Sequence, residues 1–366
     1  MRCGASRRAS DDEVLAFRAV AKRLSLLIGL VVVATVSMAA AGGNHNYSWQ
    51  LKPTGSAARL RGLSVVSGRV VWTSGSLGTV LRTTNGGATW QSVGPPGTQN
   101  LQFRDIEAFD ADTAVILSIG TGPDSRIYRT SDGGRTWQLV FVNAEPNAFY
   151  DCMTFFDDQR GLALSDPVDG RFRILGTSDG GRSWTIVAAD MPPALPLEFA
   201  FAASGQCITS AGGNDAWFGT GGGAVARVFH SSDGGLTWTV ANTPVRSGPS
   251  AGIFALAFRD TRHGLAAGGD FLAPTASPNA LALSDDGGSS WRLVADAPNQ
   301  YRSGAHWVTG TIAIIVGPSG SDVSVDQGRS WDRFDGGSFD TVDCAGGFAC
   351  WASGEQGRVA VLVRNH

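Results

Sequence analysis

The sequence lacks the patterns that mark most cofactor-dependent enzymes. It contains no Gly-rich strand-to-helix dinucleotide motif, no C-x-x-C pair and no C-x-x-C-H haem site. No cofactor or metal site is therefore predicted, and the alternative left open is Ca²⁺ or a small quinone-type cofactor held by carboxylates. The five histidines show no paired spacing of the kind that metal sites use, and they stand at His45, His230, His263, His306 and His366.

Positive charge and helical periodicity are also scarce. The chain has 29 Lys plus Arg against 32 Asp plus Glu, and after residue 41 the balance is 23 against 29. Such a balance offers no basic surface for nucleic acid. No segment after residue 41 sustains a 3.6-residue apolar period, which argues against a helical fold.

One long apolar run is present, at residues 24–41. It follows Arg18, Lys22 and Arg23 and ends in small residues with an A-x-A pattern. These features predict a signal peptide over residues 1–41 and an exported, periplasmic or secreted protein. The alternative is an uncleaved membrane anchor, because about 18 apolar residues can just span a bilayer.

What the chain has in abundance is a repeated octapeptide. TSDGGRTW at 130–137 returns with small changes five times, and the closing tryptophans are separated by 47, 47, 54, 53 and 40 residues. Periods of this length indicate an array of one supersecondary unit. The six tryptophans are Trp90, Trp137, Trp184, Trp238, Trp291 and Trp331.

Each repeat contains four short segments rich in β-branched and aromatic residues, bounded by Gly, Asp or Ser. Residues 101–141 give LQFRDIEAF, DTAVILSIG, SRIYRT and TWQLVF, which have the character of strands joined by turns. Four-stranded units at this period predict an all-β fold, a β-propeller over residues 42–366.

The number of blades follows from the two ends of the array. Three more strand-like segments follow Trp331, and a fourth is missing there. The segment 48–52, SWQLK, resembles the fourth strand of the other repeats. We therefore predict seven blades, with the N-terminal strand completing the last one and leaving no free sheet edge.

The octapeptide itself is predicted to be a turn between the third and fourth strands. An Asp at the start of a turn accepts hydrogen bonds from backbone N–H groups, two glycines supply positive φ, and the tryptophan covers the seam between blades. One copy has Asn in place of Asp, which a turn tolerates. The predicted turn residues are Asn85, Asp132, Asp179, Asp233, Asp286 and Asp326.

At these residues the chain resembles a known group. S/T-x-D-G-G-x-T-W is the Asp-box, or bacterial neuraminidase repeat, of the sialidase-like superfamily. Over residues 49–366, with FYDCMTFFDDQRGLALSDPVDGRFRILGTSDGG and GTGGGAVARVFHSSDGG, the chain resembles exported bacterial proteins related to photosystem II stability/assembly factors, often labelled "oxidoreductase". The resemblance implies a propeller that acts as a binding or assembly platform. The early F/Y-R-I-P motif of sialidases is absent.

Strand alternation places the octapeptides on one face of the disc and the longer, Gly/Pro-rich loops on the other. The mouth of the channel on the loop-rich face is where we predict a site for an envelope protein or a glycan. We expect a monomer. The candidate binding residues there are Tyr150, Asp151, Asp169, Arg227, Arg246, Asp270, Tyr301 and Arg302.

Glu198 stands out among the carboxylates, because it lies in the apolar stretch LEFAFAASG, where it should be paired or have a raised pKa. Arg227 is the predicted partner, and the pair is either functional or a structural ion pair. The alternative to a binding platform is an enzyme that uses carboxylates at the channel mouth: a glycan hydrolase with Glu198 and Asp166 as its carboxylate pair, or an oxidoreductase of the kind that the resemblance names.

Four cysteines remain after the leader. Cys344 and Cys350 flank AGGFA and are predicted to face each other across a hairpin as a disulfide. For Cys152 and Cys207, which lie in different repeats, the sequence leaves a disulfide and two buried thiols as alternatives.

Overall fold

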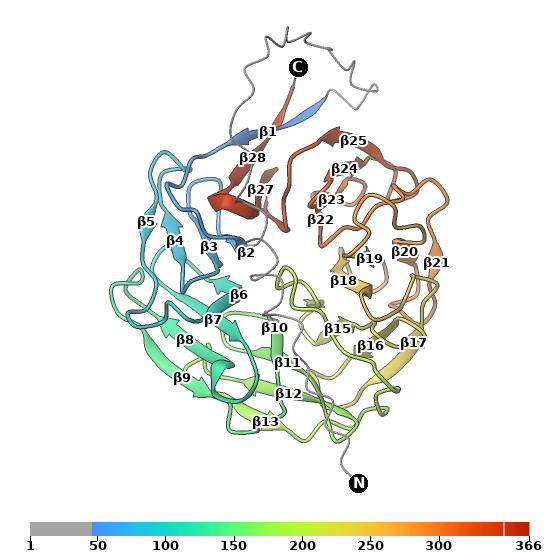
Figure 1. Ribbon diagram of the computed structural model, residues 1–366, viewed down its shortest axis with the longest axis horizontal. Coiled ribbons are helices and arrows are strands. Elements are labelled where there is room, and N and C mark those ends of the chain that lie inside the picture. The colour runs from blue at the N-terminus through green and yellow to red at the C-terminus, as the bar shows by residue number, and fades with distance from the viewer. Residues whose placement is uncertain (1–45, 347, 366) are drawn as a thin grey trace, which may run out of the picture. The chain divides into compact units, whose positions relative to one another are not determined.

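The turn-bounded strands form seven antiparallel sheets of four strands each, arranged as a ring of blades (Figure 1). The computed structural model describes residues 46–346 and 348–365, and these belong to one compact unit. The predicted seven-bladed propeller is confirmed. The predicted leader, residues 1–41, lies outside the described residues. No helix in the described ranges is long and apolar enough to cross a membrane.

The blades follow one another in sequence order, each running from the centre of the ring outward. Blades 1 to 3 consist of β2 (Leu60–Val65), β3 (Val71–Gly75), β4 (Val80–Thr83) and β5 (Gln91–Ser92); β6 (Gln102–Ala108), β7 (Ala114–Ile119), β8 (Arg126–Thr130) and β9 (Gln138–Val142); and β10 (Tyr150–Phe155), β11 (Gly161–Val168), β12 (Arg171–Thr177) and β13 (Thr185–Val187).

Blades 4 to 6 repeat this order. They consist of β14 (Ile208–Ala211), β15 (Asp215–Gly219), β16 (Arg227–Ser231) and β17 (Thr239–Asn242); β18 (Ala251–Phe258), β19 (Gly264–Asp270), β20 (Leu281–Ser284) and β21 (Arg292–Leu293); and β22 (Gly304–Trp307), β23 (Ala313–Gly317), β24 (Gly320–Ser324) and β25 (Asp332–Asp335).

Blade 7 joins the two ends of the chain. It contains β26 (Thr341–Ala345), β27 (Ala349–Ser353) and β28 (Val359–Arg364), and its outer strand is β1 (Tyr47–Leu51), which pairs antiparallel with β28. The predicted closure by the N-terminal strand is therefore confirmed. The Trp49 indole N–H also donates to Ser321 Oγ at 3.0 Å, which ties blade 7 to blade 6.

The hydrophobic core lies between neighbouring blades. Each blade has two apolar faces, because the blade before it covers one face and the blade after it covers the other, and the second strand of each blade is accordingly buried almost throughout. The octapeptide tryptophans seal the seams: the Trp90 ring meets Trp351 of blade 7 edge-on at 6.2 Å, and Trp137 meets Trp72 of blade 1 at 6.5 Å.

The octapeptides form the turns between third and fourth strands. Asp132 Oδ1 accepts the Thr136 N–H at 2.9 Å, and its Oδ2 accepts the Thr136 hydroxyl at 2.6 Å. These bonds lower the pKa of Asp132 to about 2. Gly133 and Gly134 have φ of 76° and 79°, which a Cβ disfavours. The same backbone bond, from the residue four positions on, is made by Asn85, Asp179, Asp233, Asp286 and Asp326.

Candidate functional site

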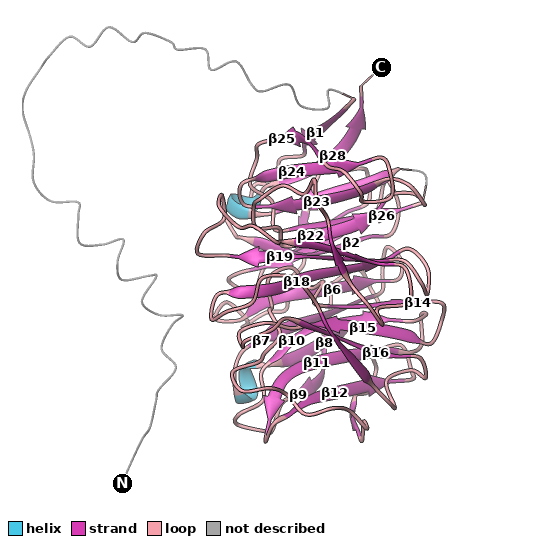
Figure 2. Ribbon diagram, turned by 90° about the vertical axis from the view of Figure 1, so that its right-hand side faces the viewer, coloured by secondary structure: helices cyan, strands magenta, loops and turns pink. Residues whose placement is uncertain are grey.

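The two faces of the disc are set by strand direction. Seen from the edge, strands run between the faces, and both 3₁₀ turns, η1 (Gly122–Asp124) and η2 (Glu355–Gly357), lie on one of them (Figure 2). We name this the start face, because the first strand of every blade begins there; it carries the blade-to-blade connections and the second-to-third loops. The opposite, octapeptide face carries the repeated turns. The inner strands around the axis are β2, β6, β10, β14, β18, β22 and β26.

Glu198 and Arg227 meet in a closed ion pair near the start face of blade 4. Arg227 Nε donates to Glu198 Oε1 at 2.8 Å and its Nη2 donates to Oε2 at 2.5 Å. The Thr220 hydroxyl and the Leu195 N–H occupy the remaining acceptor positions, at 2.6 and 2.7 Å. The Glu198 side chain is 0% exposed. This carboxylate therefore fixes the loop before blade 4 to the sheet behind it.

Arg302 is buried in a second such pair. Its Nε and Nη2 approach Asp322 Oδ2 at 2.7 and 2.5 Å, and Ser319 and Gln300 accept its other N–H groups. Tyr150 and Tyr301 are buried in the core between blades, and burial raises the pKa of both phenols. These buried side chains therefore stabilise the structure around the mouth of the channel on the start face.

Asp151 differs, because part of its carboxylate has no partner. Asp151 is 1% exposed, and its Oδ2 makes no hydrogen bond within the described chain. Burial, and then repulsion from Asp166, raise its pKa well above the usual range. Asp166 Oδ1 accepts the Ala200 N–H at 3.0 Å. The acceptor positions of Glu198 are taken by Arg227, Thr220 and the Leu195 N–H, and the Ala200 N–H that binds Asp166 lies two residues after Glu198 in the chain.

Of the other three candidates, Asp169 and Arg246 are exposed at the surface and Asp270 is partly buried. Asp169 is at a turn with φ of 53°, and its exposed carboxylate lies 3.9 Å from Arg173 Nη2. Arg246 Nη2 lies 3.5 Å from Asp270 Oδ2, and Asp270 also accepts the Ser250 hydroxyl. Among the described residues, no group of three or more His, Cys, Asp or Glu side chains is placed to hold a metal ion.

A β-bulge recurs at one level in four of the inner strands. The pairing register shifts between Leu60 and Gly62 in β2, and at the equivalent point of β6, β10 and β18. A bulge leaves one residue unpaired and redirects its side chain, and bulges are frequent next to functional sites. The bulged residues are Arg61, Arg104, Asp151 and Phe254. We call these four residues the bulge ring.

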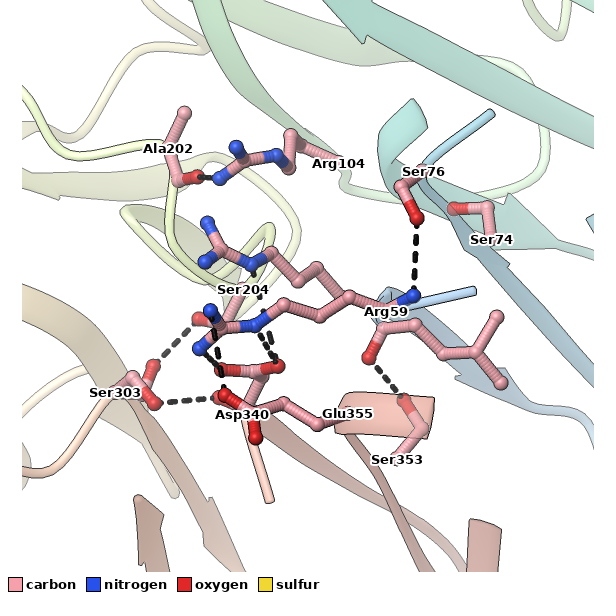
Figure 3. A network of polar contacts seen from close by, with 12 residues as sticks. Arg59, Ser74, Ser76, Arg104, Ala202, Ser204, Ser303, Asp340, Ser353 and Glu355 are labelled. Atoms are coloured by element: carbon pink, nitrogen blue, oxygen red, sulfur yellow. Dashed lines mark hydrogen bonds and ion pairs between the residues drawn. The ribbon is translucent and has the colours of Figure 1, made fainter. Parts of the chain in front are cut away.

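Arg61 and Arg104 of the bulge ring gather with Arg59 near the carboxylate of Asp340, and Glu355 adds a second carboxylate beside Arg59; Figure 3 labels Arg59, Arg104, Asp340 and Glu355. Arg59 binds Asp340 through two hydrogen bonds, at 2.8 and 2.7 Å, whereas Arg61 Nε lies 4.0 Å from it and has no hydrogen-bond partner in the described chain. Arg104 Nη1 donates to the Ala202 carbonyl at 2.6 Å. Burial, and then repulsion from Arg61, lower the pKa of Arg104 well below its usual value. Glu355 Oε1 lies 3.4 Å from Arg59 Nη1, so three guanidinium groups meet the two carboxylates of Asp340 and Glu355, and the cluster carries excess positive charge.

The segment 202–206 belongs to the connection that leads into blade 4 and crosses the axis. Beyond the Ala202–Arg104 bond, the Ser204 hydroxyl donates to Ser303 O of blade 6 at 2.5 Å. Gln206 Nε2 donates to the carbonyls of Ala305 and Val342, in blades 6 and 7, at 3.1 and 2.9 Å. We call it the crossing segment. It lies between the arginine cluster and the space that opens on the octapeptide face.

That space is a cavity of about 710 Å³. The pKa of Asp105 and that of Glu107 are both raised to about 8, first by burial; Asp343 adds repulsion at both, and Asp105 also repels Glu107. His306 Nδ1 lies 3.3 Å from Asp343 Oδ1. The lining of the cavity includes the ends of the inner strands and the crossing segment, with Asp105, Glu107, Arg259, Asp260, His306 and Asp343 as its ionisable residues.

Both pairs of cysteines form disulfides. Cys152 of β10 is bonded to Cys207, which directly follows the crossing segment, and Cys344 is bonded to Cys350 across the β26–β27 turn. The first bond anchors the crossing segment to the inner strand of blade 3.

Sequence reasoning missed the arginines of this mouth and the acidic cavity. Arg61 and Arg104 lie in the strand segments RLRGLSVV and LQFRDIEAF, which also contain Arg59, Asp105 and Glu107, so these segments lack the apolar contrast that marks Glu198. β-Bulges turn both side chains toward the axis, and the alternation of polar and apolar residues in the sequence does not reveal where a bulge lies.

No protein-family model matches the chain, and no curated protein matches it. Solved structures do. YCF48 bound to a D1 peptide has a TM-score of 0.63 at 14% identity, over 87% of this chain and 97% of that one. YCF48 from Cyanidioschyzon merolae has 0.61 at 14%, over 86% and 98%. The GH74 enzyme of Niastella koreensis has 0.60 at 14%, over 85% of this chain and 53% of that one. At these identities the likeness establishes the propeller fold, which this chain shares with a peptide-bound protein and with an enzyme.

Proposed function

We propose that the protein is a binding platform that holds an acidic segment of a partner protein against Arg61 and Arg104 at the start face. The observation that carries the proposal is the unbalanced charge of these two guanidinium groups. Arg104 donates to a neutral carbonyl, and Arg61 reaches Asp340 only at 4.0 Å, while Asp340 is already bound by Arg59.

A carboxylate from a partner would relieve this imbalance. Two buried cations that repel each other are costly, and an anion placed between them converts repulsion into charge-assisted hydrogen bonds. Arginine suits this task, because its planar donors match a carboxylate and it stays charged when partly buried.

The comparison with YCF48 supports a peptide as the ligand. That structure contains a bound D1 peptide on a propeller of the same fold. We extend to this chain only the kind of partner, a protein segment, and we base its acidic character on the arginines described above.

The test is a peptide-binding titration. A fluorescein-labelled peptide with three aspartates and a free C-terminal carboxylate is titrated with the protein and with Arg61→Gln, Arg104→Gln and the double variant. Binding should weaken about tenfold or more in each single variant, because a hydrogen bond to a charged group contributes roughly 1.5–3 kcal/mol.

Arg135→Gln is the matched control, because Arg135 is exposed in an octapeptide on the other face. Its affinity should equal that of the wild type. Equal affinity of the wild type and the double variant, both with unchanged melting temperature, would refute the proposal.

We also propose that the platform works in the cell envelope. The support is the apolar run at 24–41 with its basic flank and small-residue end. Fractionation of cells that produce the full chain, with the mass of the exported product, tests both export and cleavage after residue 41. A full-length product in the cytosol would contradict it.

A second candidate function is glycan hydrolysis in the octapeptide-face cavity. Carboxyl groups whose pKa is raised to about 8 remain protonated at neutral pH and suit a general acid, and Asp105 and Glu107 are both of this kind. The GH74 enzyme among the similar structures agrees with this candidate. An oligosaccharide screen with Glu107→Gln as control tests it, and any activity that survives the substitution removes Glu107 as the acid.

A further inference from the structure

The start-face mouth is cationic on one side and aromatic on the other. Phe254, the bulge-ring residue of blade 5, stacks on Phe201 with ring centroids 4.0 Å apart. It also meets Tyr301 edge-on at 4.7 Å and Phe271 at 6.2 Å. The level that carries Arg61 and Arg104 in blades 1 and 2 is therefore aromatic in blade 5.

Large apolar side chains stand exposed in the loops around this aromatic side. Leu197 is 73% exposed, Leu272 71% and Phe271 43%. Their loops, the connection between blades 3 and 4 and the β19–β20 loop, both open on the start face. Single exposed leucines are common, but a group of them beside a polar site marks an interaction surface.

The backbone of Leu197 adds a second observation. Its φ is +64°, in the left-handed region that a bulky side chain rarely adopts. A second leucine with this conformation is Leu77, at φ +60° and 66% exposed, also in a start-face loop. Strained backbone clusters at active sites and ligand-binding segments, where the surrounding structure holds it in place.

Both leucines lie close in the sequence to residues that hydrogen-bond to the arginine cluster. Leu77 follows Ser76, whose hydroxyl accepts the Arg59 N–H at 3.0 Å and whose own N–H donates to the Arg59 carbonyl (Figure 3). Leu197 lies five residues before Ala202, the acceptor of Arg104. Between them, Phe199 meets Phe201 at 4.8 Å, so an aromatic path leads from the exposed loop to the mouth.

We infer that Leu197, Phe271 and Leu272 form an apolar subsite over Phe254. This subsite selects partner segments that carry a large apolar side chain beside the carboxylate. Leu77 flanks the carboxylate on the opposite side. The inference rests on the proposed function, because the arginines supply the anchor. A partner protein fits these features, since acidic and apolar groups next to each other on one chain match the adjacent guanidinium and aromatic surfaces.

The test compares two labelled peptides with the same aspartates and free C-terminus. One has two leucines beside the last aspartate, and the other has two serines. The wild type should bind the leucine peptide about tenfold more tightly, because burial of a large apolar side chain is worth roughly one factor of ten. In a Leu197→Gly, Leu272→Ser variant the two peptides should bind alike, and the serine peptide should bind as it does to the wild type.

Leu197→Gly has a property that separates a contact role from a structural one. Glycine suits the left-handed φ, so the melting temperature should be unchanged or higher while the preference for the leucine peptide falls. The control is Leu236→Ser, because Leu236 is 58% exposed in an octapeptide on the other face. This variant should keep the full preference.

The outcomes separate this inference from the platform proposal. If neither peptide binds the wild type, the platform proposal fails. If both bind equally, or if the preference persists in Leu197→Gly, Leu272→Ser, the platform stands and the apolar subsite is refuted. If that variant loses binding to phosphatidylglycerol vesicles and keeps its peptide preference, the leucines contact a membrane and the inference is overturned.

Discussion

Glu198 and Arg227 hold each other through two hydrogen bonds, and every acceptor position of that carboxylate is occupied by groups of blade 4 and of the connection that leads into it. The Leu195 N–H and the Thr220 hydroxyl complete the set, while Arg227 Nη2 also donates to the Pro193 carbonyl at 2.9 Å. A long connection between blades 3 and 4 is thereby fixed by one ion pair. The role of this pair is to shape the start face.

Replacing one partner should destabilise the protein strongly. Glu198→Gln leaves the Arg227 guanidinium buried without its counter-charge, and we expect a loss of about 3 kcal/mol in the free energy of unfolding. Denaturant unfolding measures it. The double variant Glu198→Leu, Arg227→Met should recover most of the loss, because no unpaired charge remains. A single variant as stable as the wild type would show that the loop does not depend on the pair.

The two disulfides should differ in their contribution to stability. Cys152 and Cys207 are 55 residues apart in the sequence, and Cys344 and Cys350 are 6 apart. In the chain-entropy model, loops of these lengths correspond to about 4 and about 2 kcal/mol. Serine replacement of each pair, followed by denaturant unfolding, should therefore show the larger loss for the first pair. The opposite order would mean that strain or residual structure outweighs loop entropy.

The fold was predictable because it is encoded by a repeated local signal. Six copies of one turn fix the repeat length, and the hydrophobic pattern between them fixes four strands, whatever the details of packing. The seventh blade followed from SWQLK at 48–52, whose resemblance to TWQLVF identified the closing strand. Such signals need no knowledge of long-range contacts.

The site was less predictable because it depends on register and on contacts between blades. A bulge moves Arg61 and Arg104 toward the axis, and a strict two-residue alternation does not reveal which residue is unpaired. The position of Arg302 in the sequence made it a candidate for binding, yet its charge is neutralised by an ion pair with Asp322, 20 residues later. The crossing segment depends on bonds spanning 99 and 136 residues, such as those of Gln206.

Stability should fall as the pH rises from about 5 to 9, through the carboxyls of the octapeptide-face cavity. The pKa of Glu107 and that of Asp105 are raised to about 8 in the folded protein, so between the unfolded value near 4 and pH 8 the folded state binds more protons. The stability linked to these protons is fully present below pH 4 and is lost as the pH passes 8. Aspartates such as Asp132, whose pKa is lowered to about 2, have the opposite effect: the stability that they contribute is lost as the pH falls below 4.

Glu107→Gln isolates this effect. Glutamine keeps the size of the side chain and removes one titrating group, so the fall in unfolding free energy between pH 6 and pH 9 should be smaller than in the wild type. Denaturant unfolding at several pH values measures both slopes. Asp112→Asn, at an exposed carboxylate in the β6–β7 turn, is the control and should keep the wild-type slope. Identical slopes for Glu107→Gln and the wild type would mean that Glu107 is ionised at neutral pH.

Glycine at position 205 should be required by the crossing segment for two separate reasons. Its φ is +75°, and a Cβ at this position would lie 2.5 Å from Asp105 Oδ1. Asp105 cannot easily move away, since its two oxygens accept the N–H groups of Ile106 and Met153 at 2.8 and 2.6 Å. Gly205→Ala should therefore cost the strain of the left-handed backbone, about 1 kcal/mol, and an overpacking penalty of about 1–3 kcal/mol.

Gly170→Ala supplies the matched comparison, because Gly170 has a φ of +74° and a Cβ there would have no neighbouring atom within 4 Å. It should lose only the backbone contribution. Denaturant unfolding of both variants separates the two contributions, and the difference between them reports how firmly the crossing segment is pressed against Asp105. Equal losses would mean that the segment can lift from the axis at little cost, which would join the arginine-lined mouth to the cavity beneath it.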